Sequence, residues 1–236
     1  MRIHLLEHET EGISINVINW SLKNKHPLSR TYVPEAVTLP GISDFDLLII
    51  AGGPQHIWKN DKLTWLREEK RLVAKAAAAN KHIMGICLGA QMLANVLGGS
   101  VFASPPAELG WHKIVLTPEG EASPLLDLVP RQFSMFQWHS DHYTLPPGTI
   151  RLATNEAAEN QAFVSTDGRM LGIQFHPDFD CSTIFNMVKD EDEPWPRGPV
   201  VTPRQELVQQ TKSAQEPAWL MDRLMINMHK AVTAAV

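Results

Sequence analysis

The sequence predicts a single α/β domain in which helices flank a mostly parallel sheet. The stretches "MRIHLL" and "FDLLII" have the character of strands, and the second is apolar on both faces, as strands of parallel sheets are. A helical stretch follows and leads into a third apolar run, "KHIMGI". This order is typical of a βαβ unit, and 236 residues with 44% hydrophobic content can bury a large core around it.

The helix of this unit is expected within "KLTWLREEKRLVAKAAAAN", where Leu63, Leu66, Val73 and Ala77 recur at helical spacing. Asn80 is expected to end it, because asparagine tolerates the left-handed conformation that commonly follows a helix. A strand–helix–strand order of this kind favours parallel pairing of the strands on either side.

The second half of the chain contains more predicted strands than the first. Strands are expected at "HKIVLT", "QAFVST" and "MLGIQF", and Asp167 and Gly168 give the last two a hairpin turn. From Asp190, the acidic and proline-rich connector "DEDEPWPRGPVV" is expected to be exposed. Thr202, with Gln205 three residues later, predicts a capping box at the start of a short helix.

The last segment, "AWLMDRLMINMHKAVTAAV", predicts an amphipathic helix that docks on the core, a more economical interpretation than a helix that binds a partner. We therefore expect residues 1–189 to form the α/β domain, and residues 190–236 to form a connector and C-terminal helices that pack on it. The apolar face of the final helix is formed by Trp219, Leu220, Leu224, Met228 and Ala231.

The composition argues against nucleic acids and membranes as partners. Lys and Arg number 21 against 26 Asp and Glu, a formal net charge of −5, and the sequence has no basic cluster. No apolar run approaches the roughly 18 residues that a membrane helix needs, and the N-terminus lacks a secretory apolar region. These features predict a cytoplasmic protein whose two cysteines, Cys87 and Cys181, are reduced thiols.

Cys87 lies between two glycines in "HIMGICLGAQMLANVLGG", where an apolar strand gives way to a helix. Gly85 and Gly89 leave room for close backbone packing, so the turn resembles the nucleophile elbow of α/β-hydrolases with a thiol in place of the hydroxyl. A thiolate at a helix N-terminus is stabilised by the macrodipole. A buried core cysteine beside packing glycines is the alternative interpretation of this stretch alone.

A nucleophilic thiol needs a base and an oxyanion site. His176 follows the strand "LGIQF" at its carboxyl end, and Asp178, two residues later, can accept from the other ring nitrogen. The amide of Leu88 and the turn "GGP", with Gly52 and Gly53, offer backbone donors for an oxyanion. A histidine after a strand is often structural, so "HPD" gains its significance only together with the cysteine.

The motifs "GICLGAQ", "GGP" and "QFHPD" resemble those of the class I, triad-type glutamine amidotransferases. Within that family the chain is most similar to free-standing proteins that resemble the glutaminase domain of GMP synthase, because "ELGWHKIVLT" and "FQWHSDHYTLPPG" occur in the same order. The resemblance covers about residues 1–180 and implies a flavodoxin-like sheet. It also implies a nucleophile (Cys87), a base (His176), an orienting acid (Asp178), oxyanion donors (Gly53 and Leu88) and substrate contacts (Gln91, His139 and Ser140).

One residue departs from the family pattern, because glutamate is usual where this chain has Asp178. The shorter carboxylate must sit closer to His176 or bind it more loosely. Asp180 is a second carboxylate nearby, interpreted here as a solvated loop residue. His139 and Ser140 match a substrate-binding loop, for which an exposed turn is an equal alternative, and Cys181 is interpreted as a structural or incidental thiol.

The resemblance implies attack of the thiolate on the γ-amide of glutamine, a γ-glutamyl thioester on Cys87, and release of ammonia without a metal or organic cofactor. The sequence has no P-loop, so a synthetase that consumes the ammonia would be a separate partner. Two alternatives remain open. The protein could be a γ-glutamyl peptidase or hydrolase acting on γ-glutamyl peptides or amines, or a binding or regulatory module with weak catalysis.

Overall fold

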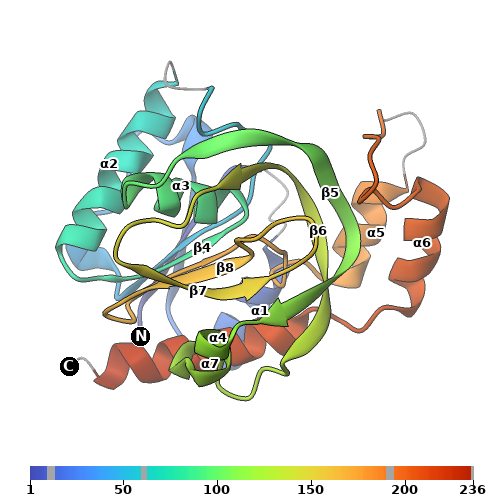
Figure 1. The fold of residues 1–236 in the computed structure, drawn as a ribbon. Coiled ribbons are helices and arrows are strands. Elements are labelled where there is room, and N and C mark those ends of the chain that lie inside the picture. The colour runs from blue at the N-terminus through green and yellow to red at the C-terminus, as the bar shows by residue number, and fades with distance from the viewer. Residues whose placement is uncertain (10–13, 60–62, 190–193, 235–236) are drawn as a thin grey trace.

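The computed structural model describes residues 1–9, 14–59, 63–189 and 194–234 and contains one nine-stranded mixed sheet (Figure 1). The strand order is β2-β1-β3-β4-β9-β8-β7-β5-β6. The strands are β1 (Ile3–Glu7), β2 (Leu28–Tyr32), β3 (Leu47–Ile50), β4 (His82–Ile86), β5 (Val101–Leu116), β6 (Gln132–Tyr143), β7 (Thr149–Thr154), β8 (Ala162–Ser165) and β9 (Met170–Ile173).

Helices cover both faces of this sheet and one of its ends (Figure 1). The α-helices are α1 (Ile15–Lys23), α2 (Thr64–Ala78), α3 (Leu88–Val96), α4 (Pro118–Ala122), α5 (Cys181–Val188), α6 (Arg204–Ser213) and α7 (Ala218–Ala234). Three short 3-10 helices are η1 (Val33–Glu35), η2 (Ile42–Asp44) and η3 (Pro124–Leu126).

Five strands, β2-β1-β3-β4-β9, pair in parallel in the order of a flavodoxin-like sheet. Because these strands run in one direction, the segments after β1, β3, β4 and β9 meet at the same edge. Ligands of open α/β sheets bind at this carboxyl edge. The chain therefore brings to one place the residues after Glu7, Ile50, Ile86 and Ile173.

The other strands pair antiparallel, and β5 and β6 form a long hairpin that curves around the front of the molecule (Figure 1). The expected α/β domain with flanking helices is confirmed, and its second half adds this antiparallel extension. The connection between β5 and β6 contains α4 and η3, whereas short connections join β7 to β8 and β8 to β9 and reverse the chain direction there, because a parallel connection needs a crossover of a dozen or more residues. The predicted turn at Gly168 is one of them, with φ +73° and a bond from its N–H to the Ser165 carbonyl.

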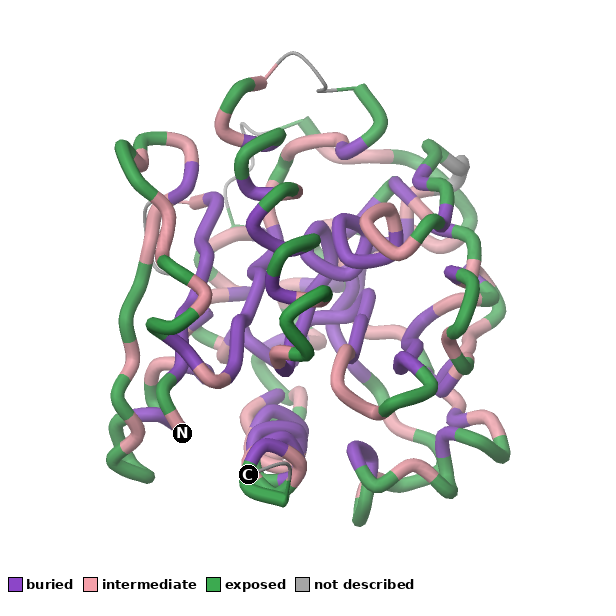
Figure 2. The backbone as a smooth tube through the Cα atoms, turned by 90° about the vertical axis from the view of Figure 1, so that its left-hand side faces the viewer, coloured by how far each residue is buried: buried purple, intermediate pink, exposed green. Residues whose placement is uncertain are grey.

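Two hydrophobic cores lie on opposite faces of the sheet. One packs α1 and α7 against the sheet, and the other packs α2 and α3. The buried tube segments in Figure 2 follow the central strands and the inner faces of these helices. In α7, Leu220, Leu224 and Met228 are buried. Asn80, with φ 56°, follows the end of α2 as predicted.

One local prediction near the C-terminus is wrong, and another holds only in part. The helix α6 begins at Arg204 with Pro203 as its N-cap and no side-chain cap bond, so Thr202 and Gln205 form no capping box. Instead, the Thr202 N–H bonds to the Leu109 carbonyl and extends the pairing along β5. The described part of the connector is not simply exposed either, because Trp195 is half-buried against Trp138, with ring centroids 6.1 Å apart.

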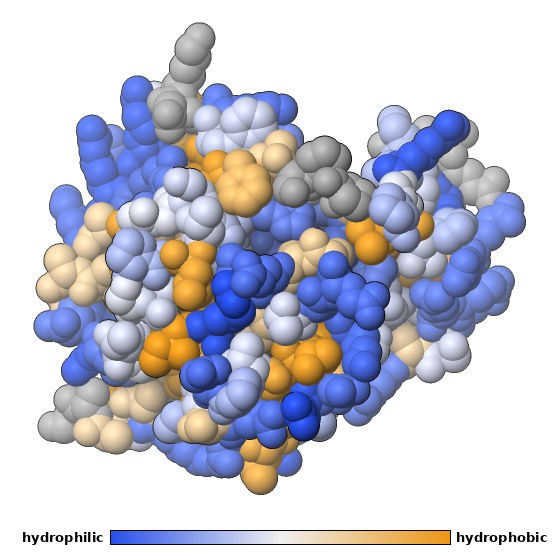
Figure 3. All heavy atoms as spheres, viewed as in Figure 1, coloured by the Kyte–Doolittle hydropathy of each residue, from blue (hydrophilic) through white to orange (hydrophobic). Residues whose placement is uncertain are grey.

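A third, smaller core joins α5 and α6 to the sheet through Leu109, Phe136 and Phe179. The surface seen in Figure 3 is mostly hydrophilic, with apolar side chains in small groups. In the described part of the chain, no helix has both the length and the apolarity needed to cross a membrane.

Candidate active site

Cys87 occupies a strained turn between β4 and α3. Its φ of 52° and ψ of −109° are rare for a residue with a side chain, and such conformations are concentrated at functional sites. Its N–H donates to the Ile173 carbonyl over 2.8 Å, and its carbonyl accepts from the Gln91 N–H. The turn is thus fixed to β9 on one side and to the first turn of α3 on the other.

The two flanking glycines are required by close packing, as the sequence predicted. A Cβ at Gly85 would lie 2.4 Å from the Gly89 carbonyl oxygen, and one at Gly89 would lie 2.1 Å from the Ile50 carbonyl oxygen. The start of α3 therefore rests directly on the backbone of β3 and β4. This contact pushes the cysteine side chain toward the carboxyl edge of the sheet.

His176 and Asp178 lie beside this cysteine, on the loop after β9. Nδ1 of His176 lies 3.1 Å from Oδ1 of Asp178, so the aspartate reaches the ring despite its shorter side chain. A Cβ at Gly52 would lie 2.9 Å from Cε1 of His176 and 3.5 Å from Cβ of Cys87. The imidazole and the thiol therefore flank the same point at the end of β3.

The start of α1 holds this loop in place, a contact that sequence reasoning missed. The Ser14 hydroxyl donates to Oδ2 of Asp178 over 2.9 Å. The Asn16 side-chain amide donates to the carbonyls of Pro177 and Phe179 over 2.9 and 2.7 Å. The Phe179 ring stacks on the imidazole of His176, with centroids 4.2 Å apart and planes 14° apart.

The electrostatics favour a protonated His176. Burial lowers the pKa of its imidazole, but the neighbouring charges of Cys87 and Asp178, together with hydrogen bonds to both, raise that pKa to about 10. The imidazolium is therefore the favoured resting form of His176. Its second ring nitrogen is fixed by Asp178, which defines the orientation of the ring.

Gly53 and Leu88 are the two expected oxyanion donors. Leu88 is the first residue of α3, and the first N–H groups of a helix have no acceptor within it. Gly53 lines the same pocket as Cys87. Both residues thus lie at the carboxyl edge of the sheet, Leu88 beside Cys87 in the chain and Gly53 in the pocket that contains the thiol.

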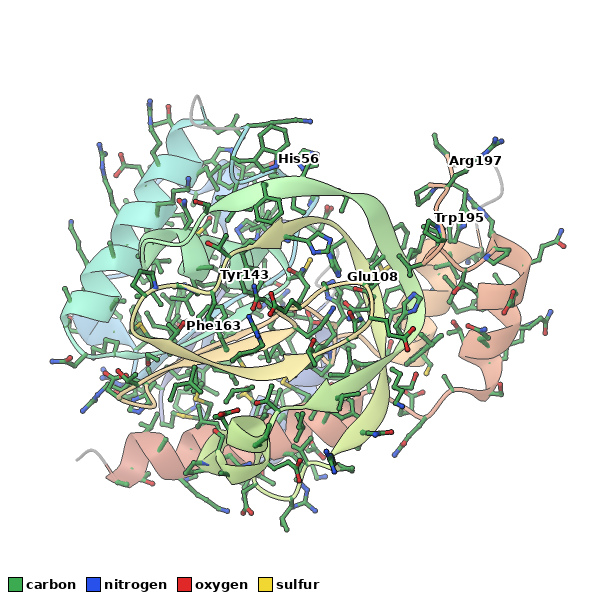
Figure 4. All side chains as sticks on the ribbon, in the orientation of Figure 1. His56, Glu108, Tyr143, Phe163, Trp195 and Arg197 are labelled. Carbon is green, nitrogen blue, oxygen red and sulfur yellow. The ribbon has the colours of Figure 1, made fainter. Side chains whose placement is uncertain are left out.

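A pocket of about 310 Å³ opens onto the thiol. Figure 4 labels two of its lining residues, His56 and Glu108. Two larger hollows, of about 650 and 620 Å³, lie beside α7 and contain none of the predicted site residues. The predicted residues that line the smaller pocket are Gly53, Cys87, Gln91, His139 and Ser140.

The prediction of a loop or exposed turn at His139 and Ser140 is wrong, because both lie on strand β6. His139 is buried, with Nε2 3.1 Å from Oε2 of Glu108 and Nδ1 3.2 Å from the Asp141 carbonyl. Glu108 also accepts from the side chains of Asn155 and Gln161. Ser140 alone of the pair is exposed. The antiparallel hairpin of β5 and β6, which the sequence analysis did not foresee, makes this wall.

Within the described residues, two buried acceptor atoms in the pocket wall have no hydrogen-bond partner, Oδ1 of Asp141 and Oε1 of Gln55. The other carboxylate oxygen of Asp141 accepts from His56 and Trp58 over 2.8 and 3.0 Å. Gln91 donates through Nε2 to the Asp141 carbonyl over 3.1 Å. The wall therefore offers unsatisfied acceptors to a ligand that carries N–H donors.

The structure corrects the interpretation of Asp180. Its Oδ1 accepts from the Thr183 N–H over 2.7 Å and caps α5, so it is a structural residue rather than a solvated one. Cys181 is the first residue of α5, and burial, followed by the nearby Glu216 carboxylate, raises the pKa of its thiol to about 12. Within the described ranges, no group of three or more His, Cys, Asp or Glu side chains is arranged to hold a metal ion.

A family model provides the decisive comparison. The model for class I glutamine amidotransferases matches residues 8–190. The chain belongs to this family. The chain is 28% identical over 198 residues to YfeJ, a glutamine amidotransferase-like protein of Salmonella typhimurium, and the match covers 82% of each chain.

Two further comparisons concern a curated relative and a solved structure. The chain is 34% identical over 138 residues to a subunit of the glutamine-hydrolysing GMP synthase of Sulfurisphaera tokodaii, a match that covers 58% of this chain and 69% of the relative. Its structure matches that of a glutamine amidotransferase from Methylobacillus flagellatus with a TM-score of 0.85 and 23% identity, over 97% of this chain and 94% of the other. The latter likeness shows the fold, and the resemblance inferred from the motifs is confirmed.

Proposed function

We propose that this amidotransferase hydrolyses the γ-amide of glutamine through a γ-glutamyl thioester on Cys87. The observation that carries the proposal is the position of the thiol: a strained residue at the start of α3, in a pocket, with the His176–Asp178 pair beside it. Membership of the class I family gives the reaction class. The finer steps below are our own derivation from the geometry.

In the first half-reaction, the Cys87 thiolate attacks the γ-carboxamide carbon and forms a carbon–sulfur bond. The carbonyl electrons move onto oxygen, where the N–H groups of Leu88 and Gly53 stabilise the negative charge. The His176 imidazolium gives its proton to the nitrogen as the carbon–nitrogen bond breaks. Ammonia leaves, and a γ-glutamyl thioester and a neutral imidazole remain.

In the second half-reaction, the neutral His176 takes a proton from a water molecule as its oxygen attacks the thioester carbon. The same two N–H groups stabilise the second oxyanion. Collapse of this intermediate expels the thiolate and releases glutamate, which restores the thiolate–imidazolium pair. Asp178 supports both steps because it holds the ring in one orientation and stabilises its positive charge.

The pocket wall suits the amino-acid end of such a substrate. Oδ1 of Asp141 and Oε1 of Gln55 have no partner in the part of the chain that the structure describes, and an ammonium group supplies three donors. Gln91 lies one helical turn after Cys87 and lines the same pocket, so it borders a bound side chain. Relatives named as subunits of glutamine-hydrolysing GMP synthases support glutamine as the substrate and a separate synthetase that accepts the ammonia.

Labelling and turnover test the proposal together. A chloroketone analogue of glutamine should label the wild-type protein and the Cys181→Ser variant stoichiometrically but leave Cys87→Ser unlabelled. Purified protein should also release equal amounts of ammonia and glutamate from glutamine, and Cys87→Ser should not. Turnover of γ-glutamyl dipeptides alone would indicate a γ-glutamyl hydrolase, and normal labelling of both cysteine variants would refute the assignment of the nucleophile.

A further inference from the structure

A buried histidine–glutamate pair lies behind the turn at Gly52 and Gly53. His8 follows β1, Glu69 lies on the inner face of α2, and both side chains are completely inaccessible to solvent. Nε2 of His8 lies 3.0 Å from each carboxylate oxygen of Glu69. Nδ1 of the same ring lies 3.2 Å from the Gly52 carbonyl oxygen. The mechanism derived above makes no use of this pair.

The partners of His8 define its protonation. A carbonyl oxygen and a carboxylate oxygen are both acceptors, so each ring nitrogen of His8 must donate a hydrogen. Burial lowers the pKa of His8, but the charge and hydrogen bond of Glu69, with the carbonyls of Gly52 and Ala51, outweigh burial and raise it. His8 is therefore an imidazolium whose counter-ion is Glu69.

The bond to Gly52 constrains the neighbouring donor. The Gly52 carbonyl and the Gly53 N–H belong to one planar trans peptide and point in opposite directions. His8 also packs against Gly53, where an added Cβ would lie 2.6 Å from Cβ of His8. A carbonyl held on the His8 side directs the Gly53 N–H away from His8. Gly53 itself lines the pocket that contains Cys87.

This turn needs an external restraint because it consists of two successive glycines. Neither glycine can be replaced without contacts below 3.0 Å, to His176 at position 52 and to His8 at position 53. Glycine backbone reaches conformations that other residues cannot, so the peptide between them rotates at little steric expense. A rotated peptide would present a carbonyl oxygen to the pocket, where it would repel the oxyanion instead of stabilising it.

We propose that His8 and Glu69 are positioning residues that lock the Gly52–Gly53 peptide with the Gly53 N–H facing the pocket. The inference rests on the proposed function and adds a cause for the geometry of one oxyanion donor. The Glu69 carboxylate fixes the His8 ring, and the ring N–H then holds the Gly52 carbonyl in one orientation.

Two matched double variants test the lock. His8→Leu with Glu69→Gln removes the donor without leaving a lone buried carboxylate. His8→Asn with Glu69→Gln restores a donor, because the asparagine amide nitrogen occupies the place of Nδ1. We expect the leucine variant to lose about 10²- to 10³-fold in kcat, the usual effect of one lost oxyanion donor. The asparagine variant should recover at least about tenfold of that loss, and KM should change little in either.

Alkylation of Cys87 by iodoacetamide separates this role from general damage to the fold. Displacement of iodide creates no oxyanion, so its rate should be equal in the wild type and both variants. Equal turnover of the two variants, or alkylation that falls in step with turnover, would overturn the inference. If the wild type does not hydrolyse glutamine, the proposed function fails separately. The crystal structure of the leucine variant then decides: a rotated Gly52 carbonyl supports the lock, and an unchanged one refutes it.

Discussion

The hydroxyl of Ser14 donates to Oδ2 of Asp178 over 2.9 Å, while Oδ1 of the same carboxylate lies 3.1 Å from His176. The acid that orients the candidate base is thus itself held by the residue that precedes α1. Asp178 is fully buried, so its second oxygen would otherwise have no solvent to accept from. A contact from the start of α1 therefore takes part in fixing the Asp178 carboxylate.

Replacement of Ser14 by alanine should loosen this carboxylate. We expect the free energy of unfolding to fall by about 1.5–3 kcal/mol, as for lost hydrogen bonds to charged groups. A loss of about 1.4 kcal/mol in transition-state stabilisation would lower kcat about tenfold. Ser21→Ala is the matched control, because Ser21 is buried like Ser14 but its hydroxyl donates within α1, to the Val17 carbonyl. Urea unfolding measures the stability of both variants, and steady-state turnover measures their kcat. Equal kcat values for Ser14→Ala and Ser21→Ala would contradict the role of Ser14.

The two aspartates that follow His176 should differ sharply. Asp178→Asn keeps the shape of the side chain but removes the negative charge that orients the His176 ring and stabilises its positive charge. We therefore expect kcat to fall by about 10²- to 10⁴-fold. Asp180→Asn keeps a good N-cap for α5 and should change kcat less than about twofold. Steady-state glutamine hydrolysis by both variants measures this difference. Losses of the same size would remove Asp178 from the proposed triad.

The protonation of His176 should depend on Cys87. Because its pKa is raised from 6.5 to about 10, the ring stays protonated at neutral and mildly alkaline pH, where an ordinary histidine is neutral. The His176 imidazolium, which protonates the departing amide nitrogen, is therefore lost only near pH 10, and kcat/KM should fall there. Cys87→Ser removes one of the neighbours that raise the pKa of His176 and should therefore lower that pKa. An NMR titration of the ring measures the pKa in both proteins, and equal values would contradict the coupling between Cys87 and His176.

The parts of the site that the sequence predicted depend on local signals. Cys87 is recognisable because glycines two residues away on each side have a steric purpose in a sharp strand-to-helix turn. His176 and Asp178 are recognisable because they follow an apolar strand directly, and strand ends of a parallel sheet share one edge. Such signals span only a few residues and need no knowledge of distant contacts.

The missed parts depend on contacts between distant segments. Ser14 lies 164 residues from Asp178, and His8 lies 61 residues from Glu69, so no local pattern links either pair. His139 was expected in a loop because the family resemblance implies one there, whereas its partner Glu108 lies 31 residues away on β5. Thr202 was misassigned because its backbone pairs with β5, and this tertiary contact outweighs the local capping signal.

The most direct test of the central claim is the mass of the protein after rapid acid quenching during its reaction with glutamine. We predict that the wild-type protein gains one γ-glutamyl group, that the group maps to the peptide containing Cys87, and that hydroxylamine releases it as a hydroxamate, as a thioester requires. Cys87→Ser should gain nothing, while Cys181→Ser should behave as the wild type. Ammonia released by the wild type without any adduct on Cys87, or with equal release by Cys87→Ser, would contradict covalent catalysis by this thiol.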